Sequence, residues 1–459
     1  IAAIATPAGE GGIGIVRMSG PDASRIAGKI FRYGRSLKPI DIESLESHRL
    51  YYGGIVDPED ERHIDEVMLV RMLPPRSFTR EEVVEISAHG GFVPVRQVLQ
   101  LCLTHGARLA EPGEFTLRAF LNGRIDLSQA EAVAGVVSAQ TSKSLELAVD
   151  ELRGRLTERL APARAALIES LAYLDAAADF PDDEIPEHDL EPSLLVARDA
   201  LQEVLAAAQT GVLYREGIQI AIVGRPNVGK SSLLNALLGS ERAIVTEIAG
   251  TTRDIIAESI NLNGIPATLL DTAGITETED VVERIGVERS EKAVEGSGVV
   301  LFMLDRSEPL QPGDTRVAQL LEPRLDDLDL VVAWNKCDLP PAQSNGRERP
   351  AWIDTAPSLE ISTVTGAGLD SLRETLFEIV AGRQAESGEP ALVTARQLDA
   401  LRRALEATEA ALAANGTGIP LDLLAVDVRT AVYAVGEITG EHISEAVLDE
   451  IFSRFCIGK

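Results

Sequence analysis

The chain has 459 residues, which is enough for about three domains of ordinary size. Hydrophobic residues make up 45% and charged residues 25% of the sequence, values typical of a folded protein with buried cores rather than a disordered chain. The formal net charge is −29, so the overall field repels nucleic acid, and any RNA contact needs a local basic patch.

The lack of a membrane span or secretory signal in the sequence and the pattern of its cysteines bear on the cellular compartment. No apolar run reaches the roughly 18 residues of a membrane span, and the first residues lack the basic segment and long apolar core of a secretory signal. Because the chain begins with Ile1 rather than Met, we expect the natural N-terminus a few residues upstream. Cys102, Cys337 and Cys456 lie far apart, without zinc-binding spacing, and their odd number argues against a disulfide framework. We expect a protein of the reducing cytoplasm without a membrane partner.

Residues 1–118 predict a mixed α/β domain. Apolar and β-branched runs bounded by turn residues predict strands at 12–20, 50–57, 66–73 and 82–91. A helix is expected at 21–31, where proline occupies the first position, and an amphipathic one at 92–106, which ends in glycine.

The sequence then becomes rich in Ala and Leu at helical spacing. Residues 119–215 predict the first part of a helical domain, with a polar, proline-punctuated break at 180–192 and a last helix that ends at Gly211. Residues 383–459 predict its second part, and helices are expected at 394–414, 418–439 and 444–459. Because helical sequence lies on both sides, we expect the region between to be inserted into one helical domain.

The inserted region, residues 216–382, alternates strands and helices. The expected strands are 217–223, 256–262, 267–271, 298–304, 330–335 and 359–362. This order predicts a Ras-like doubly wound sheet with one antiparallel pair, 256–262 against 267–271, joined by a turn at 263–266. The whole chain is therefore expected to be a multidomain α/β plus α protein.

A phosphate-binding loop, GRPNVGKSS at 224–232, follows the first strand of this region and precedes a helix. Gly224 and Gly229 allow the backbone to curl so that N–H groups point at phosphate oxygens. Lys230 brings positive charge to the outer phosphates, the Ser231 hydroxyl can ligate Mg²⁺, and the helix directs its N-terminus at the same anion.

The motif NKCD at the end of a later strand predicts guanine recognition. The Asp338 carboxylate can accept two hydrogen bonds from guanine N1–H and N2–H₂, a donor pair that adenine lacks, so it selects GTP over ATP. Asn335 can either bond the other base edge or brace the phosphate loop, and the Lys336 stem can cover the base. Ser362 and Thr363 fit the loop that backs the base with an amide, although small GTPases more often have Ser-Ala there.

The motif DTAG and the upstream run IAGTTRD predict the sensors of the γ-phosphate. Asp271 can hold Mg²⁺ through water, and Gly274 can donate its N–H to the γ-phosphate. Thr251 and Thr252 lie in the loop that reports on the γ-phosphate, and one of them should complete the Mg²⁺ shell.

The residue after DTAG departs from Ras-like chemistry. Ras-like proteins carry a Gln there to orient the attacking water, and Ile275 cannot do so. Another group must orient the water and another must offset the charge of the transition state. The acidic candidates for the water are Glu277, Glu279, Asp280 and Glu283. Arg225 and Arg253 are candidates for internal arginine fingers, and the alternative for each of these residues is a solvated switch position.

Several motifs together resemble the tRNA-modification GTPase MnmE (TrmE) family. Within the inserted region they are GRPNVGKSSLLNAL, TEIAGTTRD, DTAG, VERIGVERS and NKCD. Elsewhere they are ATPAGEGGIGIVRMSG, EISAHGG, the run PGEFTLRAFLNGRIDLSQAEA and the terminal FCIGK. The resemblance covers the whole chain in order, and the last two motifs are the most discriminating because any GTPase has a phosphate loop.

The resemblance implies a homodimer formed through an N-terminal folate-binding domain. It also implies work with the flavoprotein MnmG, which carries the FAD. Together they add a carboxymethylaminomethyl or aminomethyl group to C5 of the wobble uridine, position 34, of certain tRNAs. The one-carbon unit is expected from 5-formyltetrahydrofolate or methylenetetrahydrofolate.

For the GTPase the resemblance implies that K⁺ takes the place of the arginine finger. The implied K⁺ ligands are Asn227, Thr246, Ile248 through its backbone oxygen, and Thr251, and the implied Mg²⁺ ligands are Ser231 and Thr252. Glu283 is the implied water-orienting carboxylate, and the expected catalytic residues are Glu283, Lys230 and Cys456. The expected GTP-binding residues are Gly224, Asn227, Val228, Gly229, Lys230, Ser231, Ser232, Thr246, Glu247, Ile248, Ala249, Gly250, Thr251, Thr252, Asp271, Thr272, Ala273, Gly274, Asn335, Lys336, Asp338, Ser362 and Thr363.

For folate the resemblance implies Arg17, Glu85, Arg124 and Lys459. A carboxylate such as Glu85 suits the amide-like donor face of a pterin, and cations suit the glutamate tail. Some family members have Lys at the position of Arg124, which keeps the charge but changes the geometry.

For Cys456, near the C-terminus, the resemblance implies a place near the folate site and a part in its chemistry, and the alternative is a small buried hydrophobe. Cys102 and Cys337 are expected to be core or neutral positions, and His89 is expected to serve turn structure rather than act as a base.

Two other functions remain open from the sequence. One is a GTPase switch for ribosome assembly, which shares TTRD and DTAG but usually carries a basic RNA-binding appendage that neither helical flank shows. The other is a folate-dependent enzyme that uses the GTPase only as a regulator.

Overall fold

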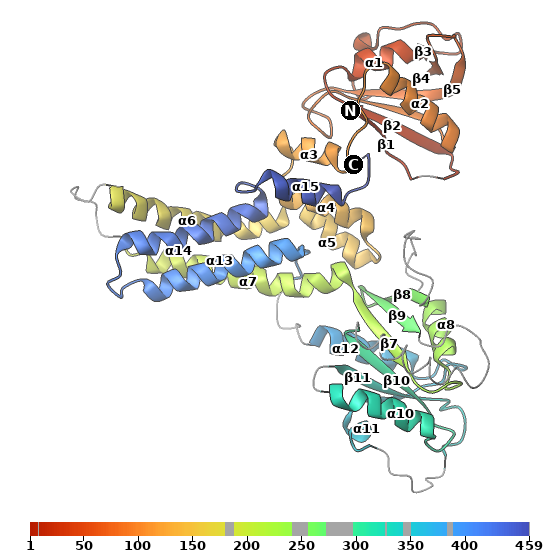
Figure 1. The fold of residues 1–459 in the computed structure, drawn as a ribbon, viewed down its shortest axis with the longest axis vertical. Coiled ribbons are helices and arrows are strands. Elements are labelled where there is room, and N and C mark those ends of the chain that lie inside the picture. Colours follow the sequence, from red (N-terminus) through yellow and green to blue (C-terminus); the bar gives the residue numbers. More distant parts are fainter. Residues whose placement is uncertain are drawn as a thin grey trace. The chain divides into compact units, whose positions relative to one another are not determined.

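The computed structural model describes residues 1–458 except 8, 180–187, 241–255, 272–296, 326–327, 343–349 and 383–388. The chain divides into two compact units, Ile1–Ala134 together with Gly436–Lys459, and Gly135–Val435 (Figure 1). The expected multidomain α/β plus α fold is confirmed, and each unit is described by itself below.

The first unit contains a six-stranded antiparallel sheet in the order β1-β2-β6-β5-β4-β3. Its strands are β1 (Ala2–Ile4), β2 (Ile13–Ser19), β3 (Phe31–Tyr33), β4 (Leu50–Val56), β5 (His63–Met72) and β6 (Val83–His89). The helices α1 (Ala23–Ile30) and α2 (Phe92–Thr104) share one apolar core with alternate residues of these strands, so both lie on the same face of the sheet. The short strands β1 and β3 were not predicted, because three residues are too few to show an alternating pattern.

Helical segments complete the first unit. They are α3 (Glu114–Leu121), the start of α4 (Leu127–Ser138), the end of α14 (Leu421–Thr439) and α15 (Glu445–Ser453). Apolar residues of α3, α4 and α15 form one cluster around Leu127, Phe452 and Phe455. The expected helix 444–459 is too long, since α15 ends at Ser453 and residues 454–458 lie outside it.

Long helices form one part of the second unit. These are α5 (Ser142–Leu152), α6 (Arg155–Asp179), α7 (Glu191–Glu216), α13 (Ala395–Ala414) and most of α14. Buried Leu and Ala recur every three or four residues along α6, α7 and α13, which is the pattern of helices packed side by side. The expected end at Gly211 is wrong, because α7 continues to Glu216. A Cβ at Gly211 would lie 1.7 Å from the Ala391 carbonyl oxygen, so glycine there permits close backbone approach instead of ending the helix.

The inserted region forms a six-stranded sheet in the order β12-β11-β10-β7-β9-β8. The strands are β7 (Ile218–Val223), β8 (Ile256–Leu262), β9 (Ile265–Asp271), β10 (Val299–Asp305), β11 (Asp329–Asn335) and β12 (Ser358–Glu360). All neighbours are parallel except β8 and β9, which pair antiparallel as predicted. Their turn is tighter than the expected 263–266: Asn263 and Gly264 alone join the strands, both with positive φ.

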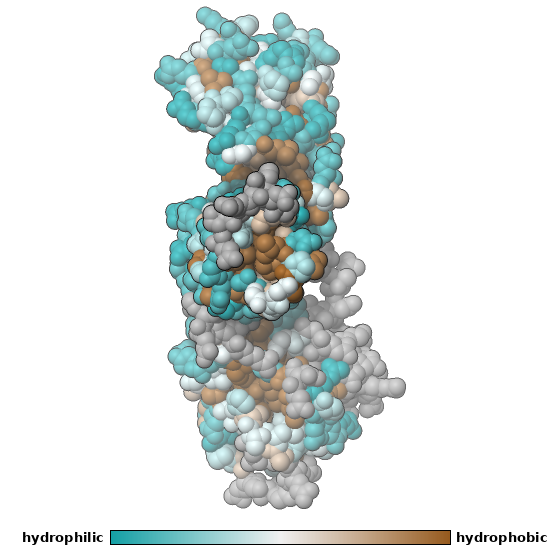
Figure 2. All heavy atoms as spheres, turned by 90° about the vertical axis from the view of Figure 1, so that its left-hand side faces the viewer, coloured by the Kyte–Doolittle hydropathy of each residue, from teal (hydrophilic) through white to brown (hydrophobic). Residues whose placement is uncertain are grey.

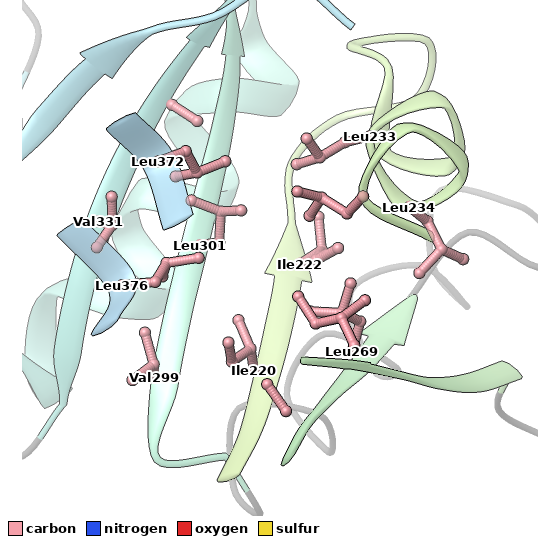
Figure 3. Packing of buried hydrophobic residues seen from close by; sticks show 14 of the residues in the cluster. Ile220, Ile222, Leu233, Leu234, Leu269, Val299, Leu301, Val331, Leu372 and Leu376 are labelled. Carbon is pink, nitrogen blue, oxygen red and sulfur yellow. The ribbon is translucent and has the colours of Figure 1, made fainter. Parts of the chain in front are cut away.

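Helices cover both faces of this sheet. They are α8 (Lys230–Ser240), α10 (Pro312–Leu321), α11 (Trp352–Thr355) and α12 (Leu369–Gly382). One face packs Ile220, Ile222 and Leu301 against α8 and α12 (Figure 3), and the other packs the intervening residues of the same strands against α10 and α11. Burial on both faces explains why these strands are continuous apolar runs in the sequence.

Polar side chains dominate the visible surface. Figure 2 shows hydrophilic residues around smaller apolar patches, as expected for a chain with a large negative charge. Among the described helices, none combines the length and hydropathy needed to cross a membrane.

Candidate functional site

The phosphate loop lies between the end of β7 and the start of α8, as predicted. Gly224 and Gly229 have positive φ values of 154° and 105°. A Cβ at Gly224 would lie 2.5 Å from the Met303 carbonyl oxygen, and one at Gly229 would lie 2.3 Å from Asn335 Nδ2. Both glycines are therefore required by the curl of the loop and by close neighbours on β10 and β11.

Lys230 directs its ammonium group into this curl. The Lys230 side chain is buried, and Nζ donates hydrogen bonds to the carbonyl oxygens of Gly224 at 2.8 Å and Arg225 at 2.9 Å. The ammonium charge and the N-terminus of the eleven-residue helix α8 thus meet at one loop, an arrangement that attracts phosphate. Ser231 and Ser232 follow in the first turn, at exposed positions.

Asn227 occupies the tip of the loop with a φ of 65°. Asparagine adopts this left-handed conformation more readily than most residues, and the residue is exposed. The next residue, Val228, is buried and fixes the loop to the protein.

Asn335, at the end of β11, braces the phosphate loop. Its Nδ2 donates to the Val228 carbonyl oxygen at 2.7 Å, and its Oδ1 accepts from the Thr363 N–H at 3.2 Å. Of the two roles left open by the sequence, the structure contains the brace. One buried amide thus joins the phosphate loop, β11 and the loop after β12.

Asp338 is held at the surface beside this brace. Its Oδ1 accepts a 2.6 Å hydrogen bond from the hydroxyl of the buried Ser362. The hydroxyl of Ser362 also accepts from the Thr365 N–H at 3.2 Å. The serine orients the carboxylate that is expected to read guanine.

The predicted γ-phosphate sensors lie largely outside the described residues. Asp271 ends β9 and pairs with Ile222 in the sheet, so its backbone lies at the strand edge beside the phosphate loop. The remaining predicted site residues of these two segments lie outside the described residues. They are Thr246, Glu247, Ile248, Ala249, Gly250, Thr251, Thr252, Arg253, Thr272, Ala273, Gly274, Ile275, Glu277, Glu279, Asp280 and Glu283.

Arg225 fits neither of the roles considered for it. Its side chain is only 17% exposed, and it pairs with Glu308 at 2.7 Å, Asp314 at 3.3 Å and Asp305 at 3.7 Å. Three carboxylates hold it away from a free, finger-like position, and it is not a solvated switch residue either.

In the first unit, Arg17 and Glu85 are direct neighbours across β2 and β6. Arg17 Nε lies 2.7 Å from Glu85 Oε1, and Arg17 Nη1 donates to the Gly458 carbonyl oxygen at 3.1 Å. The guanidinium also lies over the Phe115 ring, 5.7 Å from its centroid. A strand arginine, a carboxylate and the end of the chain are thus brought together.

Arg124 lies against Phe78, which packs in the same apolar cluster as Phe115. Its Nη1 donates to the Ser77 carbonyl oxygen at 2.5 Å, and the guanidinium lies 5.1 Å from the Phe78 centroid. Phe78 and Phe115 pack in one cluster with Ala3 and Ala110, so two of the predicted folate cations stack on rings of one group. Lys459, the last predicted member, lies outside the described residues.

Comparison with known proteins decides the family. Residues 1–124 match the family described as GTP-binding protein TrmE N-terminus, and residues 127–456 match the MnmE helical domain. The tRNA modification GTPase MnmE of Geobacillus thermodenitrificans is 45% identical over 469 aligned positions, covering 100% of this chain and 99% of the relative. The MnmE of Chloroflexus aurantiacus is 48% identical over 464 positions with the same coverage. The chain belongs to the MnmE family of tRNA modification GTPases. It is accordingly a GTP hydrolase.

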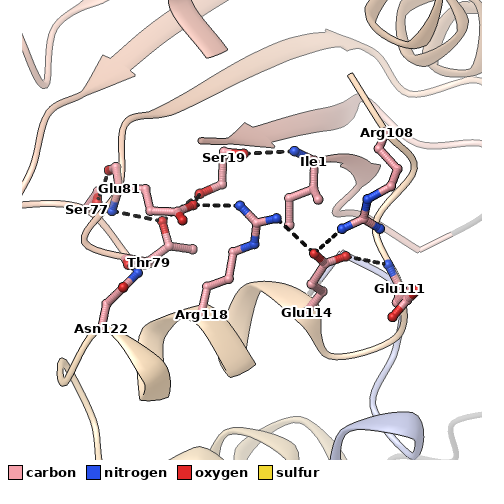
Figure 4. A network of polar contacts seen from close by, with 10 residues as sticks. All are labelled: Ile1, Ser19, Ser77, Thr79, Glu81, Arg108, Glu111, Glu114, Arg118 and Asn122. Atoms are coloured by element: carbon pink, nitrogen blue, oxygen red, sulfur yellow. Dashed lines mark hydrogen bonds and ion pairs between the residues drawn. The ribbon is translucent and has the colours of Figure 1, made fainter. Parts of the chain in front are cut away.

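The MnmE family motif PGEFTLRAF has a structural role that the sequence did not reveal (Figure 4). Arg118 of α3 bonds Glu81 at 3.0 Å and Glu114 at 2.9 Å, while Arg108 bonds Glu114 at 2.5 Å. Burial opposes ionisation of Glu114, but the two arginines and the Glu111 N–H outweigh it and lower its pKa. The network ties α3 to the sheet, and the i, i+4 spacing of Glu114 and Arg118 is the one signal in the sequence that could have indicated it.

The cysteines and His89 of this MnmE family chain are also placed. Burial raises the pKa of the Cys102 thiol to about 12, so Cys102 is an inert core residue as expected. Cys337 is partly buried and Cys456 is exposed, so the reading of Cys456 as a buried hydrophobe is wrong. His89 ends β6, and its Nδ1 lies 2.6 Å from Asp65 Oδ1, a hydrogen bond that raises its pKa.

Proposed function

We propose that this MnmE family member is a K⁺-activated GTPase that acts on tRNA. With the flavoprotein MnmG, its GTP cycle drives addition of a carboxymethylaminomethyl or aminomethyl group to C5 of the wobble uridine. The observation that supports this best is an assembled GTP site within a full-length MnmE match: Asn335 braces the phosphate loop, and Ser362 orients Asp338. The setting that we propose is the cytoplasm.

Oxygen atoms of the phosphate loop and of residues 246–252 would suit two cations, Mg²⁺ and K⁺. Ser231, in the first turn of α8, and Thr252 would supply hydroxyl oxygens to Mg²⁺. Asn227, exposed at the left-handed tip of the loop, would offer an amide oxygen to K⁺, joined by Thr246, Ile248 and Thr251. Neutral oxygens are the ligands that a monovalent cation prefers, and the bound cation would offset phosphate charge.

The remaining steps, which are phosphate binding and orientation of the attacking water, are assigned to residues of the chain. Lys230 would hold the outer phosphates, since its ammonium already lies inside the loop. With Ile275 unable to orient water, Glu283 would do so. The paired arginine Arg225 is engaged by three carboxylates, which favours a cation over an internal arginine as the source of positive charge.

The N-terminal unit would bind a formyl- or methylene-tetrahydrofolate. Glu85 suits the donor face of a pterin, while Arg17, Arg124 and Lys459 suit the glutamate tail. The paired Arg17 and Glu85 beside the terminal residues, and the stacking of Arg124 on Phe78, support a polar site with aromatic walls. The exposed Cys456 lies two residues before Gly458 and would be close to this ligand.

The proposal assigns residues 1–118 to folate binding and homodimer formation, residues 216–382 to GTP, and residues 119–215 with 383–459 to the helical domain. FAD would belong to MnmG alone.

The K⁺ assignment is tested by GTP hydrolysis in KCl and in NaCl at equal ionic strength. We expect turnover at least tenfold faster in KCl, because Na⁺ is too small for a ring of oxygens spaced for K⁺. Glu283→Ala should keep GTP affinity and lose most turnover, whereas the matched variant Glu279→Ala should keep both. Equal rates in the two salts would remove K⁺ from the mechanism.

The tRNA assignment is tested by mass analysis of wobble uridine from a strain that lacks this chain. Loss of the modified uridine, restored by the wild-type chain but not by Lys230→Ala, is the expected result. Normal wobble uridine with accumulating ribosomal subunits would instead favour a ribosome-assembly switch.

A further inference from the structure

A buried charge cluster lies where the phosphate loop and the base loop leave the sheet. Its centre is Asp305, the last residue of β10, with a side chain only 1% exposed. Asp305 Oδ2 lies 2.6 Å from Lys336 Nζ of the base loop and 3.7 Å from Arg225 Nη2 of the phosphate loop. Its Oδ1 accepts from the Ser307 N–H at 2.9 Å and hydroxyl at 2.6 Å. One carboxylate thus faces both loops while Ser307 fixes its orientation.

The topology explains why this position can join the two loops. Strand β10 lies between β7, which leads into the phosphate loop, and β11, which leads into NKCD. Asp305 is paired in register with Asn335, so its side chain lies at the shared carboxyl edge. The two loops need a common reference point there because they bind opposite ends of one nucleotide.

Each partner of Asp305 controls a group expected to contact GTP. The Arg225 carbonyl oxygen accepts from Lys230 Nζ, so the position of Arg225 affects the phosphate-binding ammonium. Lys336 stands two residues before Asp338 and has a left-handed φ of 64°, a strained conformation for lysine. Its ion pair with Asp305 is suited to hold that conformation.

The charge of Asp305 is maintained at neutral pH. Burial opposes ionisation, but hydrogen bonds from Lys336 and Ser307 outweigh it and hold the pKa of Asp305 below its usual value. A buried carboxylate with these partners is a fixed anion rather than a group that titrates near pH 7.

We propose that Asp305 is a positioning residue for GTP. Without touching the nucleotide, it holds Arg225 and Lys336 in one geometry so that the phosphate and base ends of GTP are bound together. The inference rests on GTP binding and is independent of K⁺, folate and tRNA.

Asp305→Asn and Glu308→Gln in the full chain form a matched pair. Both remove one carboxylate charge from Arg225, but Glu308 is 50% exposed, and exposed pairs contribute little. We expect Asp305→Asn to raise the Kd for fluorescent GDP and the KM for GTP about tenfold, with kcat within about threefold, because a buried charge-assisted contact is lost. Glu308→Gln should stay within about twofold on all three quantities.

A double-mutant cycle separates positioning from general destabilisation. Arg225→Gln and Asp305→Asn should each weaken GDP binding. The double variant should be no weaker than Asp305→Asn alone, since the contact that Arg225→Gln removes is already lost in that variant. The melting temperature of the nucleotide-free Asp305→Asn protein should change little. Fully additive losses, or wild-type GDP affinity in Asp305→Asn, would overturn the proposal.

Ser307→Ala provides a second route if Asp305→Asn does not fold. It removes only the hydroxyl that fixes Asp305 Oδ1, so we expect a two- to fivefold rise in the Kd for GDP, roughly the effect of one hydrogen bond. An unchanged Kd in a folded Ser307→Ala protein would count against the positioning role.

Discussion

Glu151, near the end of α5, is an ionisable residue buried to 4% exposure. Burial raises the pKa of Glu151 to about 7, although the Leu156 N–H and the charges of Arg159 and Arg155 act in the opposite direction. The folded protein therefore binds a proton at pH values where the unfolded chain, with an ordinary Glu, has lost it. The stability that Glu151 contributes is highest below about pH 4.5 and declines as the pH rises through 7.

The variant Glu151→Gln should remove this dependence. Gln cannot ionise and can still accept from the Leu156 N–H, so the variant should exceed the wild type in stability at pH 8, by at most about 3 kcal/mol. Thermal unfolding between pH 5.5 and 8.5 measures the difference, which should grow as the pH rises to about 7 and then level off. Glu146→Gln, an exposed position on the same helix, is the control and should show no such trend. A constant difference across the range would refute the assignment.

At the scale of single residues, the sequence indicated which residues belong to the nucleotide motifs better than it indicated their hydrogen-bond and ion-pair partners. The glycines, lysine and Asp338 of the nucleotide motifs lie in the loops after β7 and β11, because each motif carries its own local geometry, and their contacts with GTP stay a prediction. The role of Asn335 depended on its distance to Val228, 107 residues away. The partners of Arg225 lie about as far along the chain, and only the folded sheet brings them together.

Among the elements, α3 depends on one glycine. Gly113 precedes α3 with a φ of 67°, and a Cβ there would lie 2.6 Å from the Phe452 carbonyl oxygen of α15. The close approach of α3 and α15 therefore requires a residue without a side chain.

Gly113→Ala can be compared with Gly34→Ala at the same φ. Gly34 also has a φ of 67° but nothing within 4 Å of its Cβ position. Both variants should lose roughly 1 kcal/mol from backbone strain, and Gly113→Ala should lose a further 1–3 kcal/mol because α15 must move. Thermal unfolding gives the comparison, and limited proteolysis should release the C-terminal segment only from Gly113→Ala. Equal losses would mean that α15 adapts without cost.

Element types were more predictable than element ends. The buried strands of the inserted region and the amphipathic helices were recognised because their periodicities differ. Gly211 was read as a helix end, a sound local rule that fails where Ala391 approaches the backbone. The early end of α15 follows from contacts of the tail with β1 and β2, which no local pattern shows.

Across the whole molecule, segments that are far apart in the sequence contact each other directly. Arg17 and Gly458 are 441 residues apart in sequence and share a hydrogen bond. The fragment 1–118 lacks this tail, so we expect the proposed folate binding to require the full chain.

A chain that ends at Ser453 tests this dependence. We expect its affinity for 5-formyltetrahydrofolate, measured by calorimetry, to fall at least tenfold, since the chain loses Lys459 and the contact with Arg17. GTP hydrolysis without partners should persist. Arg454→Ala, which removes an exposed ion pair with Glu450, is the control and should bind normally. Undiminished binding by the shortened chain would separate the tail from the site.

The contact of Gly458 with the start of the chain also has a consequence for biosynthesis. A Cβ at Gly458 would lie 2.4 Å from the Ile4 carbonyl oxygen, so the tail lies directly against the first strand. The strand is synthesised several hundred residues before the tail, with the inserted GTPase region between them. The first unit can therefore be completed only after the inserted region has been synthesised.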